Sequence, residues 1–328
     1  MNRLRRVALL ALALRTALAG GLLTERRARQ RDAQLEVGGR DVRLGGRNVR
    51  VYESEPSDGG EPAIVRLPGA GDTAESWTLV TERLSRSARV VTYDRPGMGH
   101  SDPVPAADLA AVVETLDAVL AAADPMSPVV LVGHSFGGLL ARAYTATHAE
   151  RVAGLVLVDA TPPVIAKDRG VRSGFLISGG LAKVLKALAT FGLTRALLAA
   201  GAMPLYPEQR AFRRAASPDA YRRWTAAVCS NFASNAGREL SAVLPAAADF
   251  GDSLSNQPGV PVAVVFSRAY GARWEQMQRD AAQDLRAVAL HSTGARRHNI
   301  HMMRPDLVVQ GIHDVLHVPP PEPVRSST

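Results

Sequence analysis

The chain has 328 residues, and 46% of them are hydrophobic, which is enough for a sizeable core in one large domain with an insertion or in two domains. Its formal net charge of +8 belongs to the first 50 residues, which hold 12 Arg and 4 acidic residues. The rest of the chain balances 27 basic against 27 acidic groups, which argues against nucleic acid as a partner. The single Cys229 excludes an internal disulfide.

Residues 1–34 are interpreted as a signal peptide or membrane anchor followed by a basic linker. Three Arg precede an apolar run at 7–14, and Ala17-Leu18-Ala19 is typical of a signal cleavage site. As one span, residues 7–23 reach the short limit for a transmembrane helix, with Arg15 near the middle. We therefore expect an exported or anchored protein that meets the membrane only through this segment. It is cytoplasmic if the segment is not a targeting sequence.

The most informative stretch lies at residues 129–140. Four apolar residues predict a short buried strand, Gly133-His134-Ser135-Phe136-Gly137 follows directly, and a helical pattern begins at Leu139. A serine on such a strand–turn–helix elbow projects its hydroxyl out of the backbone and can act as a nucleophile. The N–H of Phe136, at the helix start, then points to where an oxyanion would form.

Strands and helices alternate from residue 63 to 159, which predicts βαβ units and a mainly parallel sheet. Ligands of such sheets bind beyond the carboxyl ends of the strands, where Ser135 and Asp159 both lie. The expected organisation is a core at 35–160 and 250–318, a helical cap or lid at 161–249, and a disordered Pro-rich tail at 319–328.

Two glycine-rich turns follow predicted strands. The loop Pro68-Gly69-Ala70-Gly71 comes before the elbow in the chain, so a backbone N–H of this loop, that of Ala70, is the expected second oxyanion donor. The turn at 94–102 carries charges that we interpret as a structural clamp.

A serine nucleophile needs a base, and in this architecture the base is a histidine late in the chain. His298 lies in a short loop before the final helix, which is the expected place. His301, three residues later, is the alternative base.

The acid that orients the base is less obvious. The segment 267–271, after the strand at 260–266, contains no carboxylate. Asp159 ends the strand next to the elbow strand and can approach the same imidazole, so it is the preferred acid. Asp284 and Asp280, on a predicted helix, are the alternatives.

Together these motifs resemble the α/β-hydrolase superfamily. The resemblance rests on the elbow, on the loop at 67–71 with Trp77, on Asp94-Arg95-Pro96-Gly97-Met98-Gly99-His100-Ser101, on the strand ending at Asp159, and on His298-Asn299-Ile300 through residue 308. It implies an eight-stranded, mostly parallel sheet flanked by helices, with a helical cap inserted after Asp159. More narrowly, the chain resembles bacterial members that carry an N-terminal membrane segment.

Two features depart from the common family pattern. Pro68 stands where many members have His before the oxyanion-loop glycine, and no acid follows the strand at 260–266. Haloalkane dehalogenases, which use the end of the preceding strand, match Asp159. Ser135 replaces the nucleophilic Asp of dehalogenases and epoxide hydrolases, which argues against both of those chemistries.

The sequence thus predicts a serine hydrolase that cleaves carboxylic esters of small or medium apolar acyl substrates, with no metal or cofactor. An amide or peptide hydrolase of the aminopeptidase type and a perhydrolase remain alternatives within the same site. A non-catalytic relative that binds a small molecule under the cap is the alternative of another class. The expected partner is a small-molecule acyl substrate.

Overall fold

The computed structural model describes residues 3–54, 62–103, 108–123, 128–233, 235–250 and 259–318. The tail at 319–328, predicted to be disordered, lies outside the described residues.

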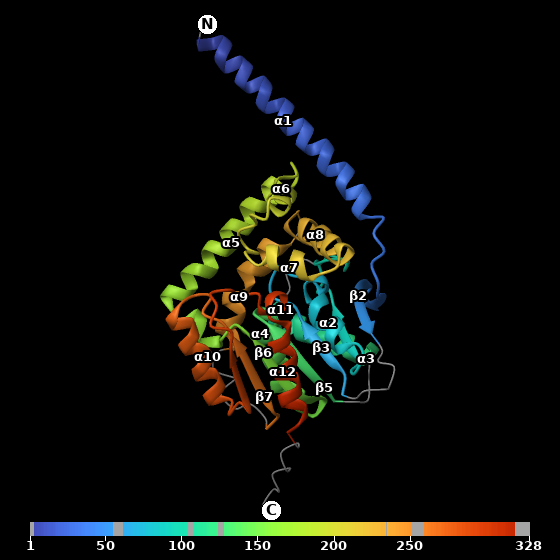
Figure 1. The fold of residues 1–328 in the computed structure, drawn as a ribbon, viewed down its shortest axis with the longest axis vertical. Coiled ribbons are helices and arrows are strands. Elements are labelled where there is room, and N and C mark those ends of the chain that lie inside the picture. Colours follow the sequence, from blue (N-terminus) through green and yellow to red (C-terminus); the bar gives the residue numbers. More distant parts are fainter. Residues whose placement is uncertain are drawn as a thin grey trace, which may run out of the picture.

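One eight-stranded sheet forms the centre of the molecule (Figure 1). The strand order is β1-β2-β4-β3-β5-β6-β7-β8. β2 pairs antiparallel with both β1 and β4, and every other neighbouring pair is parallel. The strands are β1 (Arg40–Leu44), β2 (Arg47–Ser54), β3 (Ile64–Leu67), β4 (Val90–Tyr93), β5 (Val129–His134), β6 (Val152–Val158), β7 (Val262–Phe266) and β8 (Ala289–Ser292). The predicted fold class is confirmed.

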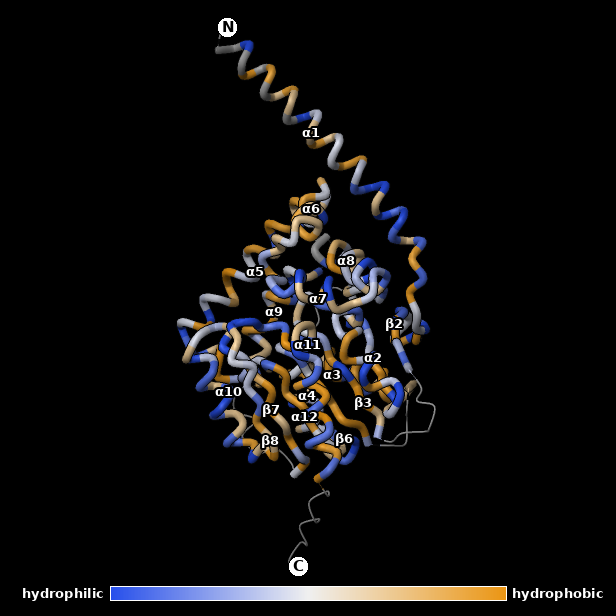
Figure 2. The backbone as a smooth tube through the Cα atoms, in the orientation of Figure 1, coloured by the Kyte–Doolittle hydropathy of each residue, from blue (hydrophilic) through white to orange (hydrophobic). Residues whose placement is uncertain are grey.

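Helices cover both faces of the sheet, so its central strands are buried throughout and mostly apolar (Figure 2). Alternate residues of a strand enter different cores: Val130 and Val132 pack in one cluster, and Leu131 packs in the other. The first cluster includes residues of η1 (Ala74–Trp77), α2 (Thr78–Leu84) and α12 (Pro305–Leu316); the second includes residues of α3 (Leu109–Ala123), α4 (Phe136–Thr147) and α10 (Ala272–Asp284). The short turn η2 (Ala149–Arg151) lies between α4 and β6, and the short helix α11 (Ile300–Met303) precedes α12.

A helical cap is inserted between β6 and β7 (Figure 1). It comprises η3 (Pro163–Ala166), α5 (Arg169–Ala189), α6 (Leu193–Ala199), α7 (Gln209–Ala215), α8 (Pro218–Ala233) and α9 (Ala236–Phe250). The cap has an aromatic centre of its own, in which Trp224 packs edge-on against Tyr206 and Phe212. This interior stabilises the cap as a packed unit.

The N-terminal segment forms one long helix, α1 (Arg3–Asp32), which projects away from the body (Figure 1). Its C-terminal half contacts the cap: Ala28 is buried, and Glu25 pairs with Arg195 of α6 at 3.0 Å. Within the described ranges, no single helix has the length and apolar composition to cross a membrane, whereas α5 and α6, bent by 107°, meet the criterion as a pair. Export or membrane anchoring therefore stays a prediction.

Candidate active site

The elbow at Ser135 has the sharp geometry that the sequence predicts. β5 ends at His134, Ser135 has φ 51° and ψ −118°, and α4 begins at once with Phe136. A side chain on Gly133 would collide with the backbone of Gly137 and Gly138, and one on Gly137 would collide with the backbone of Leu67 and Pro68, which explains the two glycines. The helix starts three residues earlier than its apolar pattern suggests, because this tertiary packing outweighs the low helix propensity of glycine.

Asp159 and His298 are brought together although 139 residues separate them. Asp159 Oδ2 lies 2.8 Å from His298 Nδ1 and also accepts the Ser267 hydroxyl at 2.7 Å. Its other oxygen accepts the Ser267 N–H at 3.0 Å and the Trp274 indole N–H at 2.8 Å. Such donors stabilise a buried carboxylate as an anion, and the anion in turn orients the imidazole.

Sequence reasoning missed Ser267 and Trp274 as partners of this carboxylate. Ser267 is the first residue after β7, the position at which we looked for an acid. Its hydroxyl and N–H donate to Asp159 from the end of the adjacent strand. The position after β7 is therefore occupied by a hydrogen-bond donor to the acid, and the acid itself lies at the end of β6. Only the position relative to β7 could have drawn attention to Ser267.

The alternative site residues lie elsewhere. Asp280 and Asp284 are exposed on α10, and neither lines the cavity that contains Ser135. His301 is fully buried in α11, with its Nε2 3.1 Å from Ser76 Oγ and its ring stacked on Trp77. The geometry favours His298 over His301 as the base.

Ser135 and His298 line a common cavity of about 70 Å³ under the cap. Ala70 also lines it, as predicted for an oxyanion donor. Among the described turns and loops, neither the Ala70 amide nor the Phe136 amide donates to a backbone carbonyl. Further lining residues come from the cap and from the loop after β7: Phe175, Leu205, Tyr206, Leu240 and Tyr270. Burial raises the pKa of Tyr270, with Asp159 adding to the shift, so Tyr270 stays a neutral phenol.

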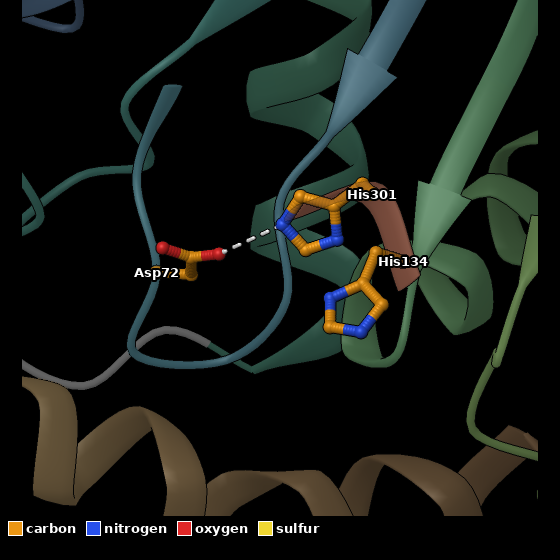
Figure 3. A group of neighbouring side chains, drawn as sticks. All are labelled: Asp72, His134 and His301. Carbon is orange, nitrogen blue, oxygen red and sulfur yellow. Dashed lines mark ion pairs between the residues drawn. The ribbon is translucent and has the colours of Figure 1, made fainter. Parts of the chain in front are cut away.

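A buried polar group lies beside the nucleophile, made of Asp72, His134 and His301 (Figure 3). His134 Nε2 lies 3.1 Å from the His298 carbonyl oxygen, so this nitrogen carries the proton and donates. Burial, then His301 and His298, holds the pKa of His134 well below its usual range, so the ring is neutral and its Nδ1 presents a lone pair. His134 therefore supports the backbone of the candidate base.

The same three residues are of metal-binding types. Their ligand atoms lie within 4.8 Å of one another, and His301 Nε2 is 3.6 Å from Asp72 Oδ2 (Figure 3). A zinc ion with bonds of about 2.1 Å requires its ligand atoms to lie closer together than 4.8 Å. The trio could hold such an ion only after the side chains moved together.

The chain is similar to known proteins both in sequence and in structure. The family model described as "Alpha/beta hydrolase family" matches residues 64–311. An uncharacterized protein of Schizosaccharomyces pombe is 41% identical over 88 residues, which are 26% of this chain and 16% of that protein. The chain spans about a sixth of the length of the curated relatives it matches.

Two solved structures illustrate the similarity of fold. The enol-lactonase of Burkholderia xenovorans shares 18% identity with a TM-score of 0.60, covering 84% of this chain and 99% of that one. A carboxylesterase structure from Nitrososphaera gargenis shares 15% identity with a TM-score of 0.63, covering 84% and 97%. Because the family model spans most of the chain and agrees with this fold, the protein belongs to the alpha/beta hydrolase family.

Proposed function

We propose that this hydrolase cleaves carboxylic esters of small or medium apolar acyl groups through an acyl-enzyme on Ser135. The observation that carries the proposal is the 2.8 Å contact between His298 and the buried Asp159, next to a strained serine in the same cavity. This arrangement supports acyl transfer, which requires a nucleophile, a base and an acid that orients the base.

The chemistry follows from these positions. His298 takes the proton of Ser135 as the hydroxyl attacks the acyl carbonyl, and Asp159 stabilises the imidazolium. The amides of Phe136 and Ala70 bind the oxyanion, and the imidazolium then protonates the leaving alcohol. Water activated by His298 releases the acid and restores the hydroxyl on Ser135.

Several observations favour an ester over the alternatives. A cavity of about 70 Å³ suits a small acyl group, and esterases and a lactonase are among the proteins of the same fold. Four acids of the cap have partners: Asp168 pairs with Arg273, Asp219 with Arg222, Glu239 with Arg95, and Glu208 accepts from Asn299. This speaks against recognition of a peptide amino terminus. The contact between Asp159 and His298 speaks against a non-catalytic relative.

The test combines a fluorophosphonate probe with a series of p-nitrophenyl esters of increasing acyl length. We expect the wild type to be labelled and to hydrolyse short or medium esters best. Ser135→Ala should lose labelling and turnover, and His298→Ala should lose most of both, because the hydroxyl then has no base.

The proposal fails if folded wild-type protein is neither labelled nor active on any ester of the series. A small ligand bound under the cap by such inactive protein would point to the non-catalytic alternative. Turnover of amino-acid anilides faster than of esters would point to the amide hydrolase instead.

A further inference from the structure

The loop at 68–72, between β3 and η1, makes one backbone hydrogen bond of its own, from the Asp72 N–H to the Gly69 carbonyl at 3.2 Å. It contains Ala70, the proposed second oxyanion donor, and Gly71 has φ +77°. An oxyanion donor must point in a fixed direction before the reaction, because reorientation during the reaction would cost the stabilisation that it provides. Groups outside the loop add to this one bond in holding the peptide planes on either side of Ala70.

Arg95 holds the first of these planes. Its guanidinium donates to the carbonyl oxygens of Pro68 and Gly69, each at 2.6 Å. The Gly69 carbonyl and the Ala70 N–H belong to one planar trans peptide, so they point in opposite directions. By binding the carbonyl on one side, Arg95 directs the Ala70 N–H to the other.

Glu239, from helix α9 of the cap, holds the second plane. Its Oε2 accepts the Gly71 N–H at 2.6 Å, and this N–H belongs to the peptide that joins Ala70 to Gly71. The same carboxylate contacts Arg95 at 2.5 and 2.9 Å. Burial alone would lower the pKa of Arg95, but Glu239 raises it above its usual value, so the guanidinium stays charged.

Two more cap side chains meet the same glycine. The Tyr206 hydroxyl and the Asn231 amide each donate to the Gly71 carbonyl at 3.3 Å. Gly71 is thus held at both its N–H and its carbonyl by α8, α9 and the segment before α7. Arg95 is buried and Glu239 mostly so, with side chains 3% and 15% exposed, so solvent screens the pair little.

We propose that the cap completes the oxyanion hole: Glu239 and Arg95 are positioning residues that aim the Ala70 N–H at the reacting carbonyl. This inference rests on the proposed function. Displacement of the cap would remove the contacts of Glu239 with Gly71 and Arg95 together, so the hole is fully assembled only when the cap is seated on the core.

The test compares Glu239→Ala and Glu239→Gln with the wild type on the best p-nitrophenyl ester. Glu239→Ala should lower kcat about 10- to 100-fold with little change in KM, because the lost interaction acts in the transition state. Glu239→Gln keeps an oxygen that can accept the Gly71 N–H and should recover part of the loss. A trifluoromethyl ketone, which forms a tetrahedral adduct on the serine, should lose affinity by the same factor as kcat.

Arg223→Gln is the matched control, because it breaks another ion pair between cap and core, that of Arg223 with Glu75 at 3.2 Å. It should lower the melting temperature without lowering kcat. The inference is overturned if the Glu239 variants keep kcat within twofold of Arg223→Gln, or if they raise KM alone. Wild-type protein that is neither labelled nor active would overturn the proposed function as well, whereas a labelled wild type with unaffected Glu239 variants would overturn only this inference.

Discussion

Ser135 occupies a backbone conformation that L-residues rarely adopt, with φ 51°. Glycine adopts positive φ without the clash of a Cβ, whereas alanine keeps that clash. We expect Ser135→Gly to be more stable than Ser135→Ala by about 1 kcal/mol, although both are inactive. Urea denaturation checks this. The matched control is Ala187→Gly on the exposed face of α5, which should be destabilised instead. Equal stability of the two Ser135 variants would show that the elbow is not strained.

His134 makes stability depend on pH, because its pKa is depressed in the folded protein. Below about pH 6.5 the unfolded chain binds a proton at this residue and the folded chain does not, so the free energy of unfolding falls as the pH is lowered. His134→Gln, which can still donate to the His298 carbonyl, should show a shallower fall between pH 6.5 and 5. Urea titrations at several pH values check this. Between pH 7 and 8 the free energies of unfolding of the two proteins should change with pH in parallel. If they stay parallel down to pH 5, His134 is not the source of the pH dependence.

At the scale of elements, β7 and α10 hold the acid of the candidate triad. The Trp274 indole of α10 donates to Asp159, and Trp274→Phe removes that donor while keeping an aromatic ring. We expect kcat/KM to fall about tenfold, because a hydrogen bond to a charged group is lost. Trp224→Phe is the control, since the Trp224 indole N–H is buried without a hydrogen-bond partner among the described residues. Equal effects of the two substitutions on ester hydrolysis would contradict the role of Trp274.

The order of elements and the residues of the elbow follow from the sequence because they depend on local patterns. Apolar runs bounded by glycine predict the strands of the sheet, and chain order selects Asp159 and His298. The charged turn at 94–102, interpreted as a clamp, indeed contains Arg95 bound to the carbonyls of Pro68 and Gly69.

The partners that the cap supplies could not be predicted in this way. Glu239 lies 144 residues from Arg95, and Tyr206 lies 135 residues from Gly71. No spacing rule connects such positions, because the relative placement of cap and core depends on packing over the whole interface. The sequence indicated that a helical cap is present, but it did not indicate which side chains of the cap reach the core.

At the scale of the whole molecule, α1 is tied to the cap by Arg195, which contacts Glu25 and Asp32. Glu25 is 3% exposed, so Arg195→Ala leaves a buried carboxylate without this cation and should loosen α1 from the cap. We expect trypsin to cleave the arginines at 26–31 several-fold faster than in the wild type. Arg222→Ala, which removes an exposed pair with Asp219, should leave the rate unchanged. Equal rates in both variants would mean that Arg195 does not anchor the helix.

The single cysteine makes this molecule well suited to spectroscopy. Cys229 is buried in α8, and burial raises the pKa of its thiol to about 12, so thiol reagents meet almost no thiolate. Cysteines introduced at exposed positions, Ala187 in the cap and Ala146 in the core, would then carry spin labels with little background. If the cap shapes the oxyanion hole, the distances between the two spin labels should form one narrow distribution. Glu239→Ala should broaden that distribution.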